Sequence, residues 1–222
     1  MDILWHVIYF LATSKFLALF IAFTSVPAAI ALAVWKGRFA IFLAIIPVLA
    51  FLSAFFGTDI AARILHAFGE KGSATITGTY GTSTVYNNHD VVGYNVLLKT
   101  ADGKVIETSF EDDDFNIYPP KNSVVYPDVG DHFSVYYLNW FPKDFVIVDN
   151  DDSPWATELR CRHLNKDVQE ANAKYEFDRN NERYRTAYID SINRLLSEKC
   201  VSDDDEINAF RQDIKNVEAG QP

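Results

Sequence analysis

Two long apolar segments constrain this chain more than any other feature of its sequence. Residues 16–35 and 39–56 contain no charged side chain, and only three residues separate them. A helix of about 20 residues crosses the ~30 Å hydrocarbon core of a bilayer and satisfies its own backbone there. The sequence therefore predicts a two-helix transmembrane hairpin within residues 1–57.

Basic residues at the turn of this hairpin predict its orientation. Lys36 and Arg38 lie between the two segments, and basic residues next to membrane spans are retained on the cytoplasmic side. We therefore expect both termini on the opposite, periplasmic side. The expected location is a bacterial inner membrane, crossed by two spans, with residues 16–56 in contact with membrane lipid.

The hydrophobic pattern changes from helical to alternating beyond the second segment. Residues 58–71 have one apolar helical face and then two glycines, which predicts an interfacial helix and a linker. An acidic β-domain is expected over residues 72–153. Its predicted strands are rich in β-branched and aromatic residues and comprise residues 74–80, 91–99, 105–110, 133–138 and 145–148. The expected sheet is small, five-stranded and β-barrel-like.

Several motifs in residues 72–149 occur in an order that resembles a known family. They are a Gly-Thr strand, the hairpin signal Asp102-Gly103, the pair Gly130-Asp131 before residues 135–138, Pro142, and the apolar residues 146–148. The order resembles a bacterial family of membrane-tethered small β-domains of uncharacterised function. This resemblance implies an extracytoplasmic β-domain without known catalytic residues. The insertion at residues 111–129 and the long helical tail depart from the family pattern.

A C-terminal helical domain is expected over residues 154–222. Ser153 and Pro154 are typical of an N-cap and a first helical residue. Two apolar stripes with steps of three and four residues flank a polar break at 178–181, and they comprise Cys161, Leu164, Val168, Ala171 and Tyr175, then Ile189, Ile192, Leu196 and Cys200. The pattern predicts a helical hairpin, with a third helix after residue 202. The expected fold class is thus an α+β membrane protein.

The two cysteines lie symmetrically about the predicted turn of this hairpin. A turn between Asn180 and Asn181 would set Cys161 beside Cys200, within the ~7 Å between Cα atoms that a disulfide needs. Such a bond persists chiefly in oxidising compartments. Two buried thiols, or one continuous helix without a turn, are the alternatives.

The negative charge of the chain is concentrated in the predicted β-domain. Residues 72–153 carry four basic and thirteen acidic side chains, and the whole chain has a formal net charge of −10. Such a domain repels nucleic acid and favours a basic partner. Three acidic clusters, at 111–114, 149–152 and 203–206, lack the spacing of a calcium loop, and the histidines lack the spacing of a zinc site. We therefore expect no metal and no cofactor.

Aromatic side chains in acidic loops form the predicted partner-binding patch, which comprises Tyr118, Tyr126, Trp140, Phe141, Asp112, Asp113 and Asp114. Exposed aromatic side chains rimmed by carboxylates are suited to binding a basic protein. The sequence contains no nucleophile-elbow or phosphate-loop motif. We therefore expect neither catalytic residues nor enzymatic activity.

These observations favour a non-enzymatic, inner-membrane-anchored protein that binds another protein through an acidic periplasmic domain. A specific version is an immunity protein against a basic toxin that acts at the cell envelope. An accessory or regulatory subunit of a membrane complex is the alternative, and a lipid-directed enzyme is a third reading. A neighbouring toxin gene would favour immunity, whereas an operon of membrane subunits would favour the accessory role.

Overall fold

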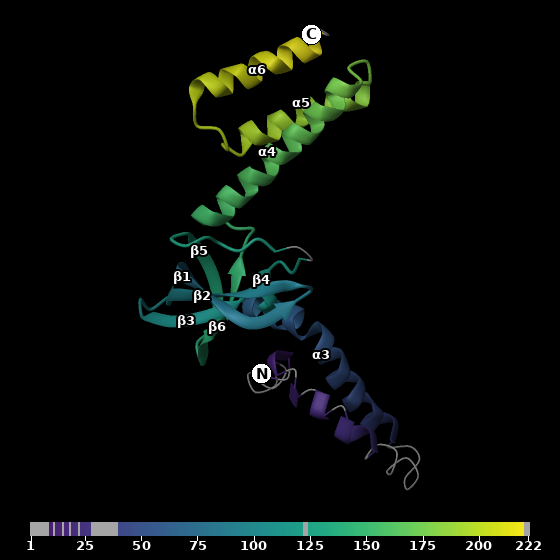
Figure 1. Cartoon of the computed structure of the whole chain (residues 1–222), viewed down its shortest axis with the longest axis vertical. Coiled ribbons are helices and arrows are strands. Elements are labelled where there is room, and N and C mark those ends of the chain that lie inside the picture. Colours follow the sequence, from purple (N-terminus) through teal and green to yellow (C-terminus); the bar gives the residue numbers. More distant parts are fainter. Residues whose placement is uncertain are drawn as a thin grey trace. The chain divides into compact units, whose positions relative to one another are not determined.

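A computed structural model describes residues 9–10, 12–14, 16–17, 19–21, 23–27, 40–121 and 124–219 of the chain. The chain divides into two compact units, Met1–Asp149 and Asn150–Pro222. The first unit contains a mixed β-sheet and helix α3, and the second contains helices α4 to α6 (Figure 1).

The first unit is built on one six-stranded sheet. Its strands are β1 (Glu70–Tyr86), β2 (His89–Lys99), β3 (Val105–Glu111), β4 (Ile117–Tyr118), β5 (His132–Leu138) and β6 (Phe141–Val148). Their order in the sheet is β3-β2-β1-β5-β6-β4. All neighbours pair antiparallel except β4, which is parallel to β6.

The predicted five-stranded sheet is therefore wrong, because a sixth strand lies within the insertion at residues 111–129. Strand β4 has only two residues, too few for any alternation of polar and apolar positions to indicate it. Its place depends on backbone hydrogen bonds from Ile147 to the carbonyl of Asn116 at 2.8 Å and from Asp149 to that of Tyr118 at 3.1 Å. Strands β3 and β4 are the outer strands of the sheet, which is open, so the predicted barrel-like closure is also wrong.

Two hairpins connect the first three strands. Gly103 has a φ of 86° in the turn between β2 and β3, so the hairpin predicted from Asp102-Gly103 is confirmed. In the turn between β1 and β2, Asn87 and Asn88 have φ values of 50° and 65°. Asparagine tolerates this left-handed conformation better than most residues, and a tight primed turn requires it at both central positions. This turn extends β1 beyond the predicted strand at 74–80.

Helix α3 (Ala40–Phe68) packs the face of its second half against the sheet. Ala61, Ala62 and Leu65 are buried in one cluster with Leu138 of β5 and Val146 of β6. The helix runs without a break through residue 57, where the sequence predicts the end of a membrane span. Burial of these apolar side chains contributes on the order of 25 cal/mol per Å² of apolar area removed from water.

The membrane prediction is contradicted by this structure. In the described part of the chain, no helix combines the length and the apolar character that a bilayer crossing requires. The predicted two-span hairpin, and the inner-membrane location with periplasmic termini that followed from it, are therefore wrong. Hydropathy could not show that this helix continues beyond residue 57 and packs its second half on the sheet. Residues 28–39, at the predicted turn of the hairpin, lie outside the described residues.

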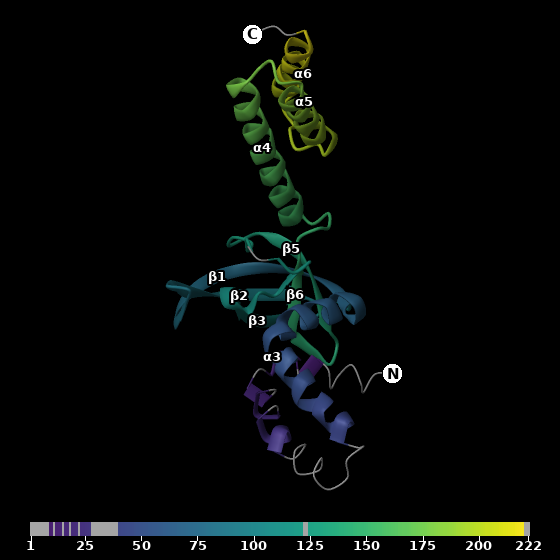
Figure 2. The ribbon, with the colours of Figure 1, turned by 90° about the vertical axis from the view of Figure 1, so that its right-hand side faces the viewer.

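The second unit consists of three helices, α4 (Pro154–Phe177), α5 (Glu182–Ser197) and α6 (Asp204–Glu218) (Figure 2). Side chains cap each N-terminus. Ser153 Oγ accepts a hydrogen bond from the backbone N–H of Ala156, as the sequence predicts. Asn181 and Asp203 accept hydrogen bonds in the same way at the starts of α5 and α6. Caps of this kind contribute roughly 1 kcal/mol each.

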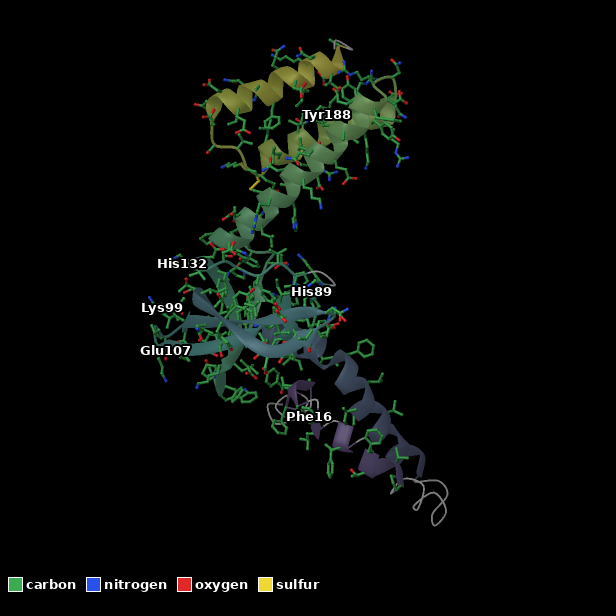
Figure 3. All side chains as sticks on the ribbon, viewed as in Figure 1. Phe16, His89, Lys99, Glu107, His132 and Tyr188 are labelled. Atoms are coloured by element: carbon green, nitrogen blue, oxygen red, sulfur yellow. A yellow bond between two sulfur atoms is a disulfide. The ribbon has the colours of Figure 1, made fainter. Side chains whose placement is uncertain are left out.

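The predicted disulfide is confirmed, because Cys161 and Cys200 are bonded with their Cα atoms 5.2 Å apart (Figure 3). The polar break at residues 178–181 forms the turn between α4 and α5, which places both apolar stripes in one core. Ile192 and Leu195 are completely buried in that core. The two free thiols and the uninterrupted helix are thereby excluded.

Candidate functional site

The acidic aromatic groove is a surface hollow of about 350 Å³ at the turn end of the β1–β2 hairpin. Its walls come from β1, β2, the short helix η1 (Asp112–Asp114) and the segment before β5. The residues that define it are Tyr86, Asp90, Tyr94, Asp112, Asp113, Phe115 and Tyr126. None of the described residues that line this groove is Lys or Arg.

Aromatic rings hold the walls of the groove in place. Tyr94 stacks on Phe110 with ring centroids 4.8 Å apart, and Tyr126 packs against both rings at 5.7 and 5.0 Å. On the other side, the edge of Tyr86 meets Phe115 at 5.7 Å. Such pairs contribute about 0.5–1.5 kcal/mol each beyond area burial. These ring contacts therefore support the walls of the groove, which present aromatic faces.

Helix η1 positions the carboxylates beside these rings. The side chain of Asp114 accepts a hydrogen bond from the backbone N–H of Glu111 at 2.8 Å, which closes the turn. The hydroxyl of Tyr126 donates to the carbonyl of Asp112 at 3.3 Å. Phe115, which follows η1, has a φ of 50°. This left-handed conformation is unusual for a bulky residue, and backbone strain of this kind tends to occur at functional sites.

The electrostatic potential in the groove is negative, and the tyrosine hydroxyls respond to it. Burial, followed by the carboxylates of Asp114 and Asp112, raises the pKa of Tyr126. Burial, followed by Asp112 and Asp128, raises the pKa of Tyr94. Both hydroxyls therefore stay neutral at ordinary pH. A cation in the groove would meet carboxylates and the electron-rich faces of aromatic rings together.

The structure brings together part of the predicted partner-binding patch. Tyr126, Asp112 and Asp113 line the same groove. Asp114, the next residue of η1, lines a different cavity. The sequence had indicated the acidic and aromatic character of this region, and the fold supplies the arrangement.

The remaining aromatic residues of the predicted patch lie elsewhere in the first unit. Tyr118 stacks on His66 of α3 with ring centroids 3.7 Å apart and planes 12° apart, so it packs on the helix. Trp140 and Phe141, at the β5–β6 turn, are 46% and 47% exposed, with ring centroids 6.2 Å apart. These three residues do not line the groove.

The predicted patch did not include Tyr86, Asp90 and Phe115, which line the groove. Asn87-Asn88 was the available signal, because two residues that tolerate positive φ between alternating segments indicate a hairpin. Reading that turn would have paired Tyr86 with His89, as the structure does. No local pattern could have indicated Phe115, because its place depends on the fold of η1 against β2.

A second hollow, the Tyr9–Asp144 cavity, has a volume of about 270 Å³ and is lined by residues of α3, by residues of the sheet and by Tyr9, Ala12 and Thr13. The hydroxyl of Tyr9 donates a hydrogen bond to Asp144 Oδ2 at 2.9 Å. Burial raises the pKa of Asp144, the Tyr9 hydrogen bond opposes this, and Asp114 adds to it. Besides Tyr9, Asp114 and Asp144, the titratable residue that lines this cavity is Lys143. Its side chain is exposed, and its carbonyl accepts a hydrogen bond from Thr108 at 2.9 Å.

Replacement of Tyr9 by phenylalanine is expected to raise the pKa of Asp144 further, because the ring stays while the donor to the carboxylate is lost. The carboxyl group of Asp144 binds its proton more tightly in the folded state than in the unfolded chain, where the pKa of Asp is near 3.8. The contribution of Asp144 to the free energy of unfolding therefore falls as pH rises from that value through its raised pKa. In Tyr9→Phe this range should extend to higher pH.

A carbon-13 NMR titration of the side-chain carboxyl groups measures this pKa directly. Tyr80→Phe is the matched control, because Tyr80 lies on β1 outside the cavity lining. A pKa of Asp144 that is unchanged or lowered in Tyr9→Phe would contradict the assigned hydrogen bond.

The first unit thus belongs to a general class, an α+β module that presents an acidic aromatic groove. Comparison of the chain with protein-family models, with curated proteins and with solved structures found no match. In the described part of the chain, no group of three or more His, Cys, Asp and Glu side chains is arranged to hold a metal ion. The chemistry of the groove itself is therefore the basis for a functional proposal.

Proposed function

We propose that this chain is a non-enzymatic protein-binding protein whose acidic aromatic groove receives a Lys or Arg side chain of a basic partner. The observation that carries the proposal is the composition of the groove, which combines Asp90, Asp112 and Asp113 with the rings of Tyr86 and Phe115. Carboxylates attract the charged head of such a side chain, and aromatic faces accommodate both its cation and its methylene stem.

The charge around the groove supports the same proposal. Residues 72–153 carry thirteen acidic and four basic side chains, so a basic protein would be attracted over a distance comparable to the Debye length, ~8 Å at physiological ionic strength. Electrostatic attraction of this kind mainly raises the association rate. Nucleic acid, which is itself an anion, would be repelled.

The disulfide supports a site of action in an oxidising compartment, since the bond between Cys161 and Cys200 would be reduced in most cytosols. An immunity protein that neutralises a basic toxin outside the cytoplasm is a specific form of the proposed function. An accessory subunit with a basic partner would use the same groove, and the gene neighbourhood distinguishes the two forms.

Binding of short basic peptides tests the proposal directly. We expect blocked tripeptides with a central Lys or Arg to shift the NMR signals of Tyr86 and Tyr126 in a saturable manner, whereas the matched Gln peptide should not. Binding should weaken as salt is added, because the attraction is partly Coulombic. Equal shifts with the Lys and Gln peptides would refute the proposal.

Variants of the groove locate the interaction. Asp112→Asn combined with Asp113→Asn should weaken binding of the Arg peptide roughly tenfold, and Tyr86→Leu, which keeps an apolar side chain without an aromatic face, roughly threefold. Glu107→Gln is the matched charge control, because Glu107 lies on β3 near the Lys99 end of β2, away from His89 at the groove (Figure 3). Equal loss of affinity in the control would mean that net charge alone, without the groove, accounts for binding.

A further inference from the structure

The Tyr9–Asp144 cavity is separate from the acidic aromatic groove and has no role in the proposed function. Its volume of about 270 Å³ is at the small end of the range for ligand pockets, roughly 300–1,000 Å³. Phe110 lies in its wall, and the ring of the same residue packs against Tyr94 and Tyr126 of the groove, although Phe110 does not line the groove. A ligand of this cavity would have to be a small molecule.

One side of the cavity is apolar. Ala61, Ala62 and Leu65 of α3 line it, and they are all buried. Val146 of β6 completes this wall. Small alanine side chains leave room here for a short carbon chain, which would exchange water for apolar contacts at about 0.8 kcal/mol for each buried methylene group.

The rest of the lining provides hydrogen-bond acceptors and negative charge, and its described residues include one cation, Lys143, whose side chain is exposed. The hydroxyl of Tyr9 donates a hydrogen bond to Asp144 Oδ2. Oδ1 of the same carboxylate is left to accept a hydrogen bond from a ligand. Asp114 lines the same cavity and adds a second negative charge. Asn116 Oδ1 is shielded from solvent and has no hydrogen-bond partner among the described residues. A buried acceptor without a donor costs about 1–3 kcal/mol, so this side of the cavity favours a ligand rich in N–H donors.

We propose that this cavity binds a small primary alkylamine as its ammonium cation. The ammonium group donates to Asp144 Oδ1 and, after a small rotation of the amide, to Asn116, and the negative charge of Asp114 stabilises it. The alkyl chain lies against Ala61, Ala62 and Leu65.

The composition of the cavity discriminates among small ligands. An anion would meet two carboxylates. A neutral alcohol would keep the apolar contact but lose the Coulombic attraction, and a quaternary ammonium would keep its charge but offer no N–H donor to the two acceptors. A primary ammonium has both the charge and three donors.

Titration of the full-length protein with n-butylammonium, followed by NMR of the Ala61, Leu65 and Val146 methyl groups, tests this site. We expect a saturable shift with n-butylammonium, at least roughly tenfold weaker binding of n-butanol and tetramethylammonium, and no shift with sodium at the same ionic strength. Equal binding of tetramethylammonium, or the absence of any saturable shift, would overturn the proposal.

Two variants change different parts of the cavity lining. Asp144→Asn retains an acceptor for Tyr9 but loses the charge, and should weaken n-butylammonium roughly tenfold. Ala61→Leu should block the site by filling the space for the alkyl chain. Because the two variants are independent, a folding defect in one of them does not remove the test. Glu107→Gln should bind normally. Unchanged affinity in a folded Asp144→Asn or Ala61→Leu protein would place the amine elsewhere. Groove variants such as Asp113→Asn should not affect this binding, which separates it from the proposed partner site.

Discussion

Replacement of both Cys161 and Cys200 by serine is expected to lower the free energy of unfolding of the helical unit by about 4 kcal/mol. The two cysteines are 39 residues apart in the sequence. A crosslink that closes a loop of that length lowers the conformational entropy of the unfolded chain, which is equivalent to about 4 kcal/mol of free energy. The bond joins α4 to the segment between α5 and α6, so its loss should destabilise the contacts of all three helices. Amide hydrogen exchange resolved by peptide measures the effect within the full chain.

Reduction of the unchanged protein provides the control for this prediction. A reductant should increase exchange in α4, α5 and α6 to the level of the double serine variant, and should have no further effect on that variant. The sheet should keep its protection in both proteins. Equal protection of the three helices with and without the bond would contradict the expected contribution of the disulfide.

Replacement of Gly57 by alanine is expected to destabilise the first unit by about 1–3 kcal/mol, the usual range for overpacking. In an ordinary helix interior, the same change would stabilise by up to ~1 kcal/mol. Here a Cβ atom at position 57 would lie 2.2 Å from the carbonyl oxygen of Ala12 and 3.1 Å from its carbonyl carbon. Backbone atoms cannot move aside as the end of a flexible side chain can, so Ala12 would be displaced from α3.

Thermal unfolding of Gly57→Ala measures the sign of this effect, and n-butylammonium binding measures its consequence. Displacement of Ala12 would also move Tyr9 from Asp144 and open the cavity, so affinity for the amine should fall. Gly78→Ala is the control, because a Cβ there meets no atom within 4 Å. A Gly57→Ala protein that is more stable than the parent would show that Gly57 and Ala12 do not pack as closely as described.

Local chemistry accounts for the elements that could be predicted. Asp102-Gly103 indicates its hairpin because few residues other than glycine and asparagine tolerate positive φ. Ser153 and Pro154 indicate the start of α4 because a hydroxyl acceptor and a residue without an N–H group suit a helix N-terminus. The disulfide pairing followed from the equal distance of Cys161 and Cys200 from the turn at residues 178–181. Each of these signals depends on neighbours in the sequence or on a simple periodicity.

Non-local packing accounts for what could not be predicted. Strand β4 is too short to have a pattern, and it exists because β6 offers it backbone partners. The groove combines Tyr86 at a hairpin end with Phe115 and Tyr126 from a later segment, across many residues of sequence. The predicted patch was therefore assembled from residues of similar character, of which only Tyr126, Asp112 and Asp113 share this surface.

The apolar content of residues 39–56 illustrates the limit of hydropathy. The sequence correctly indicated a helix in this region, but α3 does not end at residue 57. The apolar and polar residues that follow belong to the same helix, which continues onto the sheet.

The sequence by itself determined the acidic charge, the Asp102-Gly103 turn, the start of α4 and the pairing of the cysteines, because these depend on residue type and spacing. Only the tertiary structure decided what α3 packs against and which rings and carboxylates meet, because burial and electrostatic potential are sums over residues that are distant in the chain.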